Sequence, residues 1–357
     1  MDALKGLILS GGKGTRLRPL THTSAKQLVP VANKPVLFYG IEAMKAAGID
    51  EVGIIVAPET GGEIRAAAGD GSQFGVRIEY IEQDAPLGLA HAVLTGEEFL
   101  GDSPFVMYLG DNLLRDGIVD LVGTFTSEQP DALILLTPVP DPEQYGVAEL
   151  NDGRVARLVE KPKEPQSDLA LVGVYMFTPS IFDAARAIEP SGRGELEITD
   201  AIQHLVDSGR QVDPHIVHGW WKDTGQVEDM LEANRLILDD IEERLEGELV
   251  DCRVEGRVAI EKGARLERAT VRGPAIVGAG TQVRDAYIGP YTAIAENVTI
   301  EDAELEHSIL LAGSTVRQLE YRIEASLIGR NVTIGRGPAF PKAYRFVVGD
   351  SSDIQIL

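Results

Sequence analysis

Short apolar runs and amphipathic stretches alternate along the first two thirds of the chain. The amphipathic stretches predict helices at residues 63–68 and 90–99, and another after Pro35 with a buried face. That face holds Val36, Leu37, Gly40, Ile41 and Met44. The apolar runs predict strands at residues 7–10, 52–56, 76–81, 105–109, 133–139, 155–159, 171–177 and 215–220. Apolar strands alternating with helices favour an α/β fold whose mostly parallel sheet is covered on both faces.

The pattern changes after about residue 225. Residues 226–249 have apolar positions at helical spacing and acidic residues on the other face, which predicts a connecting helix. We therefore expect one domain over residues 1–235, a connecting helical segment over 236–250 and a second domain over 251–357.

A six-residue repeat fills most of the second domain. Apolar residues six positions apart form sets that start 17 residues apart. A β-solenoid with three short strands per coil explains this period, whereas a β-sandwich would space its strands less regularly. The last segment, residues 339–357, lacks the repeat, and we expect it to cap the last coil. The sets are Val254, Ile260 and Leu266; Val271, Val277 and Val283; and Ile288, Ile294 and Ile300.

Composition narrows the functional classes. The 357 residues include 33 Lys and Arg against 56 Asp and Glu, a net charge of −23, which disfavours nucleic acids and anionic membranes as partners. The single cysteine, Cys252, excludes an intrachain disulfide and fits a reducing cytoplasm. The first residues lack the basic and apolar regions of a signal peptide, and no apolar run reaches the ~20 residues of a membrane helix.

A glycine-rich turn follows the first predicted strand. Residues 10–16 read Ser-Gly-Gly-Lys-Gly-Thr-Arg, and such a turn presents backbone amides to an anion. The turn lies at the carboxyl edge of the predicted sheet, where open α/β proteins bind their ligands. An anion site at this edge makes a polyphosphate the expected ligand. The turn is neither a P-loop, since Gly14 is followed by Thr15 and Arg16, nor a dinucleotide fingerprint, since position 17 is Leu.

The longer string around this turn is more specific. The sequence "LSGGKGTRLRPLT" followed by Lys26 resembles the sugar-1-phosphate nucleotidylyltransferases, and "SAKQLVPVANKP" is similar to their glucose-1-phosphate thymidylyltransferase branch. The strings "YIEQDAPLGLAHA", "YLGDN", "YGVAE", "EKP", "VGVY", "RGELEITD" and "WWKDTG" follow in the same order. The resemblance covers residues 5 to about 235. With the solenoid, it implies the long form, a Rossmann-like domain plus a hexapeptide-repeat left-handed β-helix.

The resemblance implies a reaction and a set of catalytic residues. Thymidylyl transfer from dTTP to α-D-glucose 1-phosphate, by direct in-line attack assisted by Mg²⁺, would give dTDP-glucose and pyrophosphate. Asp111 and Asp223 would hold Mg²⁺, which takes one or two protein carboxylates together with phosphates. Arg16 and Lys26 would neutralise the triphosphate, and Lys161 would hold the sugar phosphate.

The remaining site residues follow from the same motifs. The amide of Gln83 presents a donor and an acceptor, which match the N3–H and O4 edge of thymine or uracil. Trp220 and Trp221 are equally compatible with a pocket wall and with the core. The expected nucleotide contacts are Leu9, Gly11, Gly12, Gly14, Thr15, Gln27, Gln83, Pro86 and Gly88. The expected sugar-phosphate contacts are Asn112, Gly146, Glu160, Val172 and Arg193.

Two alternatives stay open, and a third is disfavoured. The enzyme could use UTP or several nucleotides, since thymine and uracil share one hydrogen-bonding edge. The solenoid could be an acyltransferase, for which His307 is the candidate base. A regulatory subunit is disfavoured because every charged motif residue is present. We expect a homo-oligomer of unspecified order.

Overall fold

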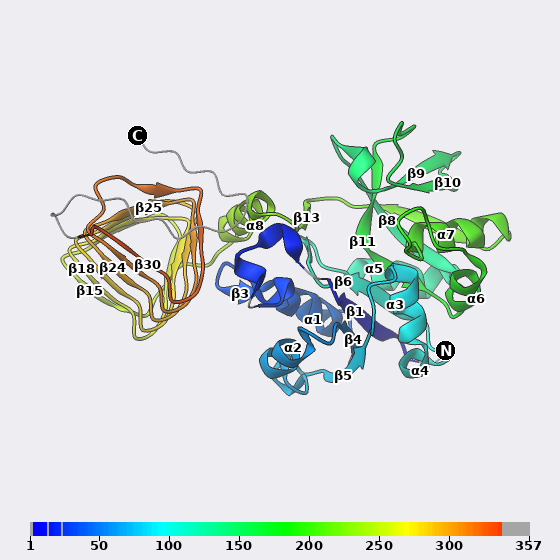
Figure 1. Cartoon of the computed structure of the whole chain (residues 1–357), viewed down its shortest axis with the longest axis horizontal. Coiled ribbons are helices and arrows are strands. Elements are labelled where there is room, and N and C mark those ends of the chain that lie inside the picture. The colour runs from blue at the N-terminus through cyan, green and yellow to red at the C-terminus, as the bar shows by residue number, and fades with distance from the viewer. Residues whose placement is uncertain (1–2, 13, 23, 338–357) are drawn as a thin grey trace. The chain divides into compact units, whose positions relative to one another are not determined.

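The computed structural model describes residues 3–12, 14–22 and 24–337 (Figure 1). The chain divides into two compact units, one ending at Ile241 and the other starting at Glu242. No helix in the described ranges combines the length and apolarity needed to span a bilayer. The expected cap, residues 339–357, lies outside the described residues.

A mixed sheet forms the centre of the first unit. Nine of the described strands take part, in the order β10-β9-β11-β6-β1-β4-β5, with β8 joined to β11 and β12 joined to β8. The predicted α/β fold is confirmed, since β1, β4, β5 and β6 run parallel, whereas β11 is antiparallel to β6. The strands are β1 Lys5–Ser10, β4 Glu51–Val56, β5 Arg77–Glu82, β6 Phe105–Leu109, β8 Ala132–Pro138, β9 Gly146–Asn151, β10 Arg154–Glu160, β11 Leu169–Phe177 and β12 Val212–Ile216.

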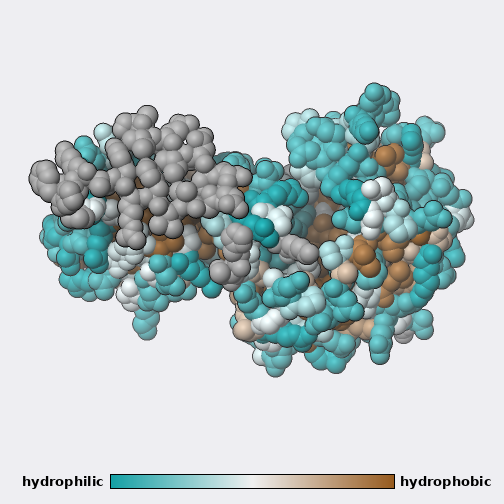
Figure 2. All heavy atoms as spheres, in the orientation of Figure 1, coloured by the Kyte–Doolittle hydropathy of each residue, from teal (hydrophilic) through white to brown (hydrophobic). Residues whose placement is uncertain are grey.

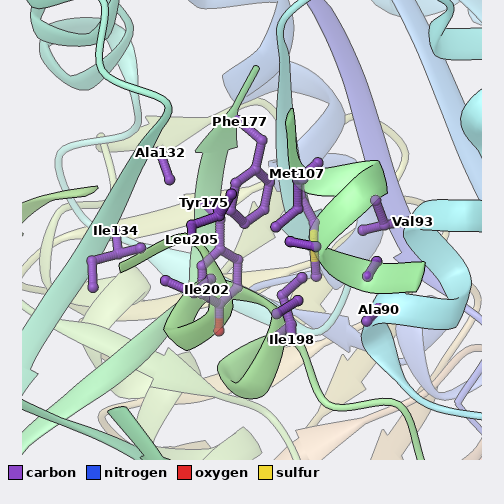
Figure 3. Close-up of a cluster of buried hydrophobic side chains, with 14 of the residues drawn as sticks. Ala90, Val93, Met107, Ala132, Ile134, Tyr175, Phe177, Ile198, Ile202 and Leu205 are labelled. Carbon is purple, nitrogen blue, oxygen red and sulfur yellow. The ribbon is translucent and has the colours of Figure 1, made fainter. Parts of the chain in front are cut away.

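Helices bury apolar side chains against the sheet. The predicted face of α1 is confirmed, because all five of its residues are buried. Figure 3 shows another part of the core, where Val93 of α3 and Ile202 of α7 lie close to Met107 and Tyr175 of the sheet. The helices are α1 Val36–Ala46, α2 Gly61–Ala68, α3 Leu89–Thr95, α4 Glu97–Leu100, α5 Val119–Glu128, α6 Ser180–Ala187, α7 Ile198–Asp207 and α8 Val227–Asp239.

Three sequence predictions about elements are wrong in part. The helix expected at 90–99 is broken at Gly96, which separates α3 from α4. The strand expected at 215–220 lies earlier, as β12, and Trp221–Asp223 forms a separate strand, β13, paired with β7 Asn112–Leu114. The sequence predicted a connecting helix over 226–249 and a connecting helical segment over 236–250. The helix ends at Asp239, and strands begin at Arg244.

Parallel strands in three sheets build the second unit, in agreement with the predicted solenoid and consistent with a left-handed β-helix. Val254 pairs with Val271 and Val271 with Ile288, so the 17-residue coil inferred from sequence is confirmed. The inward side chains form one apolar core. The sheets are β14 Arg244–Leu245, β17 Val258–Ile260, β20 Ala275–Val277, β23 Thr292–Ile294, β26 Ile309–Leu310, β29 Leu327–Ile328; β15 Glu248–Val250, β18 Arg265–Glu267, β21 Gln282–Arg284, β24 Thr299–Glu301, β27 Thr315–Arg317, β30 Thr333–Gly335; and β16 Arg253–Glu255, β19 Thr270–Arg272, β22 Tyr287–Ile288, β25 Glu304–Glu306, β28 Ile323–Glu324.

Charged residues cover much of the surface. On the face drawn in Figure 2, hydrophilic residues predominate on the first unit, with smaller hydrophobic areas between them. Along the sheet that contains β21, a column of alternating acids and bases runs through Glu267, Arg284, Glu301 and Arg317, with ion pairs of 3.8, 3.5 and 3.7 Å. Such exposed pairs add little stability individually, about 0–1 kcal/mol each, and keep the surface polar.

Candidate active site

The glycine-rich turn packs directly on a lysine. It follows β1 and leads into a 3₁₀ turn at Thr15–Leu17. Gly14 has φ of 60°, and a Cβ there would come within 2.9 Å of the Cβ of Lys26. The hydroxyl of Thr21 donates to the Gly14 carbonyl at 2.6 Å. A side chain at position 14 would therefore push the turn away from Lys26.

Two aspartates meet beside Lys26. Asp111 lies just after β6, and the pairing of β7 with β13 brings Asp223 next to it. The Lys26 ammonium forms an ion pair with Asp111 and lies 3.9 Å from Oδ1 of Asp223. Burial on its own lowers the pKa of Lys26, but the two carboxylates outweigh it, so the pKa is raised and the amine stays charged. Burial and the charge of Asp111 raise the pKa of Asp223.

The same carboxylates suit a divalent cation. Oδ1 of Asp223 is buried and accepts no hydrogen bond from the described residues. A buried carboxylate oxygen without a donor is costly, and a bound cation would compensate it. Within the described part of the chain no three His, Cys, Asp or Glu side chains group as a metal site. Two carboxylates thus fit a Mg²⁺ ion that takes its other ligands from phosphates and water.

Arg16 lies next to this centre. A Cβ added at Gly225 would lie 3.3 Å from Oδ1 of Asp223 and 3.5 Å from Nη1 of Arg16, so the two side chains approach each other across that glycine. Arg16 forms no ion pair within 4 Å with the described carboxylates, which leaves its charge available to an anion. The sequence-predicted cations Arg16 and Lys26 are therefore brought together with both aspartates.

A cavity of about 220 Å³ opens above the glycine-rich turn. Most of the predicted nucleotide contacts line it, and Gly14 and Thr15 are not among the lining residues. The predicted residues that do line it are Leu9, Gly11, Gly12, Gln27, Gln83, Pro86 and Gly88. Sequence reasoning missed Ile55, Leu89, Ala92, Leu109 and Glu195. Leu89, Ala92, Leu109 and Glu195 lie within the recognised motifs, which was the available signal, whereas Ile55 lies only in a predicted strand.

Two glutamine amides present unpaired oxygens at this cavity. Nε2 of Gln83 lies 2.9 Å from Nδ1 of His91, a contact that the sequence did not predict. Its Oε1 lies close to Gly11, since a Cβ added there would be 3.2 Å away. Gln27 is 2 % exposed, and its Oε1 is buried without a partner among the described residues. A bound nucleotide could supply donors to both oxygens.

Gly88 lies in the wall of this smaller cavity, which is called the nucleotide cavity below because most of the predicted nucleotide contacts line it. Its φ of 106° and ψ of 171° fall in a region that only glycine occupies readily. A Cβ at this position would lie 2.3 Å from the carbonyl oxygen of Leu196. The Leu196 amide donates to Leu87 at 2.7 Å, and its carbonyl accepts from Ala90 at 3.0 Å. These two hydrogen bonds hold residues 87–90 against the segment that precedes α7, and this contact is called the clasp below.

A second cavity, of about 520 Å³, adjoins the first, and Leu89 and Leu109 line both. Arg16, Asn112, Gly146, Glu160, Lys161 and Asp223 line it among the predicted residues. Lys161 has φ of 44°, an uncommon backbone conformation for lysine, and forms no ion pair with the described carboxylates. An unneutralised cation held in this way is suited to bind a phosphate.

Glu160 is held in a defined orientation. The Thr199 hydroxyl donates to its Oε2 at 2.7 Å, and Nη2 of Arg193 donates to its Oε1 at 3.1 Å. Burial raises the pKa of Glu160, and the nearby charge of Glu197 adds to that effect, while the hydrogen bond from Thr199 lowers it. Sequence reasoning missed Thr199, which lies 39 positions away from Glu160.

Two predicted sugar-phosphate contacts do not line the cavity. Arg193 forms ion pairs with Glu160 at 3.1 Å, Glu195 at 3.5 Å and Glu197 at 2.8 Å, so its charge is already compensated. Val172, which was expected to contribute through its backbone, is fully buried in the core. Both roles remain predictions.

Trp221 fits both open alternatives, because it packs against an apolar core cluster and also lines a cavity. It lines the second cavity, and its indole N–H donates to Oδ1 of Asn112 at 2.6 Å. Its ring packs edge-to-face against Tyr145, with centroids 5.5 Å apart. Nδ2 of Asn112 in turn donates to Oδ1 of Asp111 at 2.9 Å. Trp221 therefore forms part of the pocket wall and orients Asn112 beside the carboxylate pair.

Nucleotidyl transfer requires a grip on the phosphates, charge to neutralise them and room for two substrates. The glycine-rich turn, the carboxylate pair with its two cations and the two adjoining cavities meet these needs. The chain belongs to the nucleotidyl transferase family, whose sequence model matches residues 5–240. Over 99% of both chains it is 58% identical to the glucose-1-phosphate thymidylyltransferase of Streptomyces antibioticus.

Two solved structures share the fold of the first unit. One is a Bacillus anthracis protein assigned as a glucose-1-phosphate thymidylyltransferase, in complex with a sucrose; the TM-score is 0.64 at 37% identity, covering 68% of this chain and 98% of that one. The other is a UDP-glucose pyrophosphorylase complexed with UDP-glucose; the TM-score is 0.60 at 26% identity, covering 66% and 99%. The family resemblance inferred from the motifs is thereby confirmed.

Proposed function

We propose that this chain transfers a thymidylyl group from dTTP to α-D-glucose 1-phosphate, giving dTDP-glucose and pyrophosphate. The observation that carries the proposal is the pair of adjoining cavities with Arg16, Lys26, Asp111 and Asp223 grouped at them. The 58% identity to a thymidylyltransferase along the whole chain supports the choice of substrates.

The chain contributes position and charge to this reaction. The nucleotide lies in the smaller cavity with its phosphates over Gly11 and Gly12. Lys161 holds the phosphate of the sugar in the larger cavity, so that a phosphate oxygen faces the α-phosphorus. That oxygen forms the new P–O bond as the bond between the α- and β-phosphates breaks. Arg16 and Lys26 stabilise the charge on the departing pyrophosphate.

Asp111 and Asp223 would hold Mg²⁺. When bound, the ion neutralises phosphate charge at the reacting phosphorus. Arg16 and Lys26 face the three phosphates of the nucleotide, and Lys26 is already paired with Asp111. The carboxylate pair is therefore expected to bind the cation together with the nucleotide.

A grid of nucleotides and sugar 1-phosphates tests the proposal. We expect pyrophosphate release to be fastest with dTTP and glucose 1-phosphate, to require Mg²⁺ and to stop with EDTA. Absence of release from this pair at every Mg²⁺ concentration would refute the proposed function. Equal rates with UTP would keep the mechanism and make the enzyme a uridylyltransferase as well.

Other parts of the proposal concern the whole chain. The solenoid serves assembly into a homo-oligomer, and we expect the enzyme to work in the cytoplasm without nucleic-acid or membrane partners. The acyltransferase alternative depends on His307, whose ring packs edge-to-face against Tyr291 with centroids 6.2 Å apart. Acetyl-CoA turnover with a sugar amine phosphate would revive that alternative.

A further inference from the structure

His91 contacts the side-chain amide of Gln83, the residue expected to bind the base. It lies on α3, three positions after Gly88, and its Nδ1 is 2.9 Å from Nε2 of Gln83. The Gly88 carbonyl is a second, weaker neighbour of the same nitrogen, at 3.5 Å. Gln83 itself is only 8 % exposed, so few other partners can reach its amide.

These two neighbours decide which way the amide points. A carbonyl oxygen can only accept, and an amide nitrogen can only donate, so Nε2 belongs on the side of Gly88. Nδ1 of His91 then accepts the other contact, which places the imidazole proton on Nε2 of the ring. The acceptor end of Gln83, Oε1, is left beside Gly11 in the nucleotide cavity, without a donor among the described residues.

We propose that His91 is a positioning residue for base selection: it holds Gln83 so that an acceptor faces the base. An acceptor at this point pairs with the N3–H of thymine or uracil. Cytosine carries an unprotonated N3 there, so its lone pair would face that of Oε1. The inference rests on the proposed function and deepens it, because it names the group that excludes cytosine nucleotides.

Loss of the Nδ1 acceptor should relax this selection. The freed amide can rotate and offer its nitrogen to the N3 of cytosine. One correctly paired or mispaired buried hydrogen bond changes binding by roughly tenfold or more. The ratio of kcat/KM for dTTP to kcat/KM for dCTP should therefore fall by about that factor, through a loss with dTTP and a gain with dCTP.

The test compares this ratio in the full-length wild type, His91→Leu and His91→Asn, with glucose 1-phosphate and Mg²⁺ saturating. Leucine fills the space without an acceptor, whereas the Oδ1 of asparagine replaces Nδ1. We expect His91→Leu to lower the ratio about tenfold and His91→Asn to keep it within about threefold of wild type. An equal loss with both nucleotides in His91→Leu would mean a merely structural role and would overturn the inference, as would the same low ratio in both variants.

Binding measurements separate this inference from the proposed function. If the wild type binds dTTP but releases no pyrophosphate, the proposed function fails. The ratio of dissociation constants for dTTP and dCTP in the same three proteins then still tests His91. If His91→Leu does not fold, His91→Ala takes its place, and an unchanged dissociation-constant ratio in that variant overturns the inference.

Discussion

The clasp between Gly88 and Leu196 allows a quantitative test. In a Gly88→Ala variant the new Cβ would lie 2.3 Å from the Leu196 carbonyl oxygen, about 1 Å inside ordinary contact, and the backbone angles are unfavourable for alanine. The backbone conformation costs about 1–3 kcal/mol. Breaking both hydrogen bonds of Leu196 costs about 0.5–1.5 kcal/mol each. Together these effects lower the free energy of unfolding by about 2–6 kcal/mol if the alanine keeps the native backbone angles of residue 88 and displaces Leu196.

The cavity wall at residues 87–90 can instead shift, and the variant then loses activity rather than stability. Relief of the overlap needs a shift of about 1 Å at a segment that lines the nucleotide cavity, and such a misplacement can reduce the rate about 10²-fold. We therefore expect kcat/KM for dTTP to fall about 10²-fold, or the unfolding midpoint to drop by several degrees, or both. Pyrophosphate release and thermal unfolding are measured on the same sample.

Gly62→Ala is the matched control. Gly62 lies in α2 with open space around its Cβ position, and alanine favours a helix over glycine by about 0.5–1 kcal/mol. This variant should unfold at the same or a slightly higher temperature. If Gly88→Ala matches the wild type within threefold in kcat/KM and within one degree in midpoint, the clasp is not a constraint and the reasoning from the Leu196 contact is wrong.

Three further predictions concern the catalytic unit. Asp111→Asn and Asp223→Asn should each lower kcat roughly 10²-fold or more with little loss of stability, measured by pyrophosphate release at saturating Mg²⁺; near-normal turnover would remove that residue from the metal role. Lys161→Met should raise KM for glucose 1-phosphate about 10- to 150-fold while KM for dTTP changes little, and a reversed pattern would place Lys161 at the nucleotide. UTP should be about 10- to 200-fold poorer than dTTP in kcat/KM, since a single methyl group is worth ~1–3 kcal/mol; equal values would leave no methyl pocket.

One prediction concerns the solenoid. Every described residue that lines the two cavities precedes Ile241, so a chain ending there should still bind both substrates and release pyrophosphate, with a changed oligomeric state in sedimentation. A folded shortened chain that binds dTTP but cannot react would show that the solenoid completes the site.

The solenoid was predictable in detail because its period leaves little choice. An inward residue must stack on the inward residue of the next coil, so sequence spacing alone gave the pairing of Val254 with Val271. The prediction of a helix over 226–249 was wrong at its end because the spacing there is ambiguous. Leu245 and Leu249 are four positions apart, which fits a helix, but they pair with Ile260 and Leu266 as the first coil of the stack. A four-residue spacing is compatible with both structures.

The irregular strand β12 could not be found from an apolar run. Asp213 and Pro214 interrupt it, and they are tolerated because β12 pairs only with β8, at an edge where a missing N–H costs little. Apolar patterning detects strands buried on both faces and passes over strands of this kind.

The site was predictable as a set of motifs and less so as a set of contacts. Motifs identified eight of the 13 residues that line the smaller cavity, where glycine positions are imposed locally, but only six of the 19 that line the larger one as site residues. They did not reveal that Arg193 is compensated by three glutamates, or that Thr199 and His91 hold Glu160 and Gln83. Which polar atoms meet depends on the approach of distant segments, and residue type alone does not fix it.

The stacking of coils has a consequence for how this part of the chain can change its length. Most inward residues recur after 17 positions, but Ile294 pairs with Leu310, 16 positions on, and Leu310 with Ile328, 18 positions on. One coil is thus a residue shorter and the next a residue longer, while Ile294, Leu310 and Ile328 all stay buried, so the difference in length is absorbed at the corners between the strands. Insertions and deletions should accumulate at these corners in related sequences, and whole coils should be gained or lost as units. In the first unit, by contrast, one residue inserted in β1 would turn every following side chain of that strand to the opposite face of the sheet.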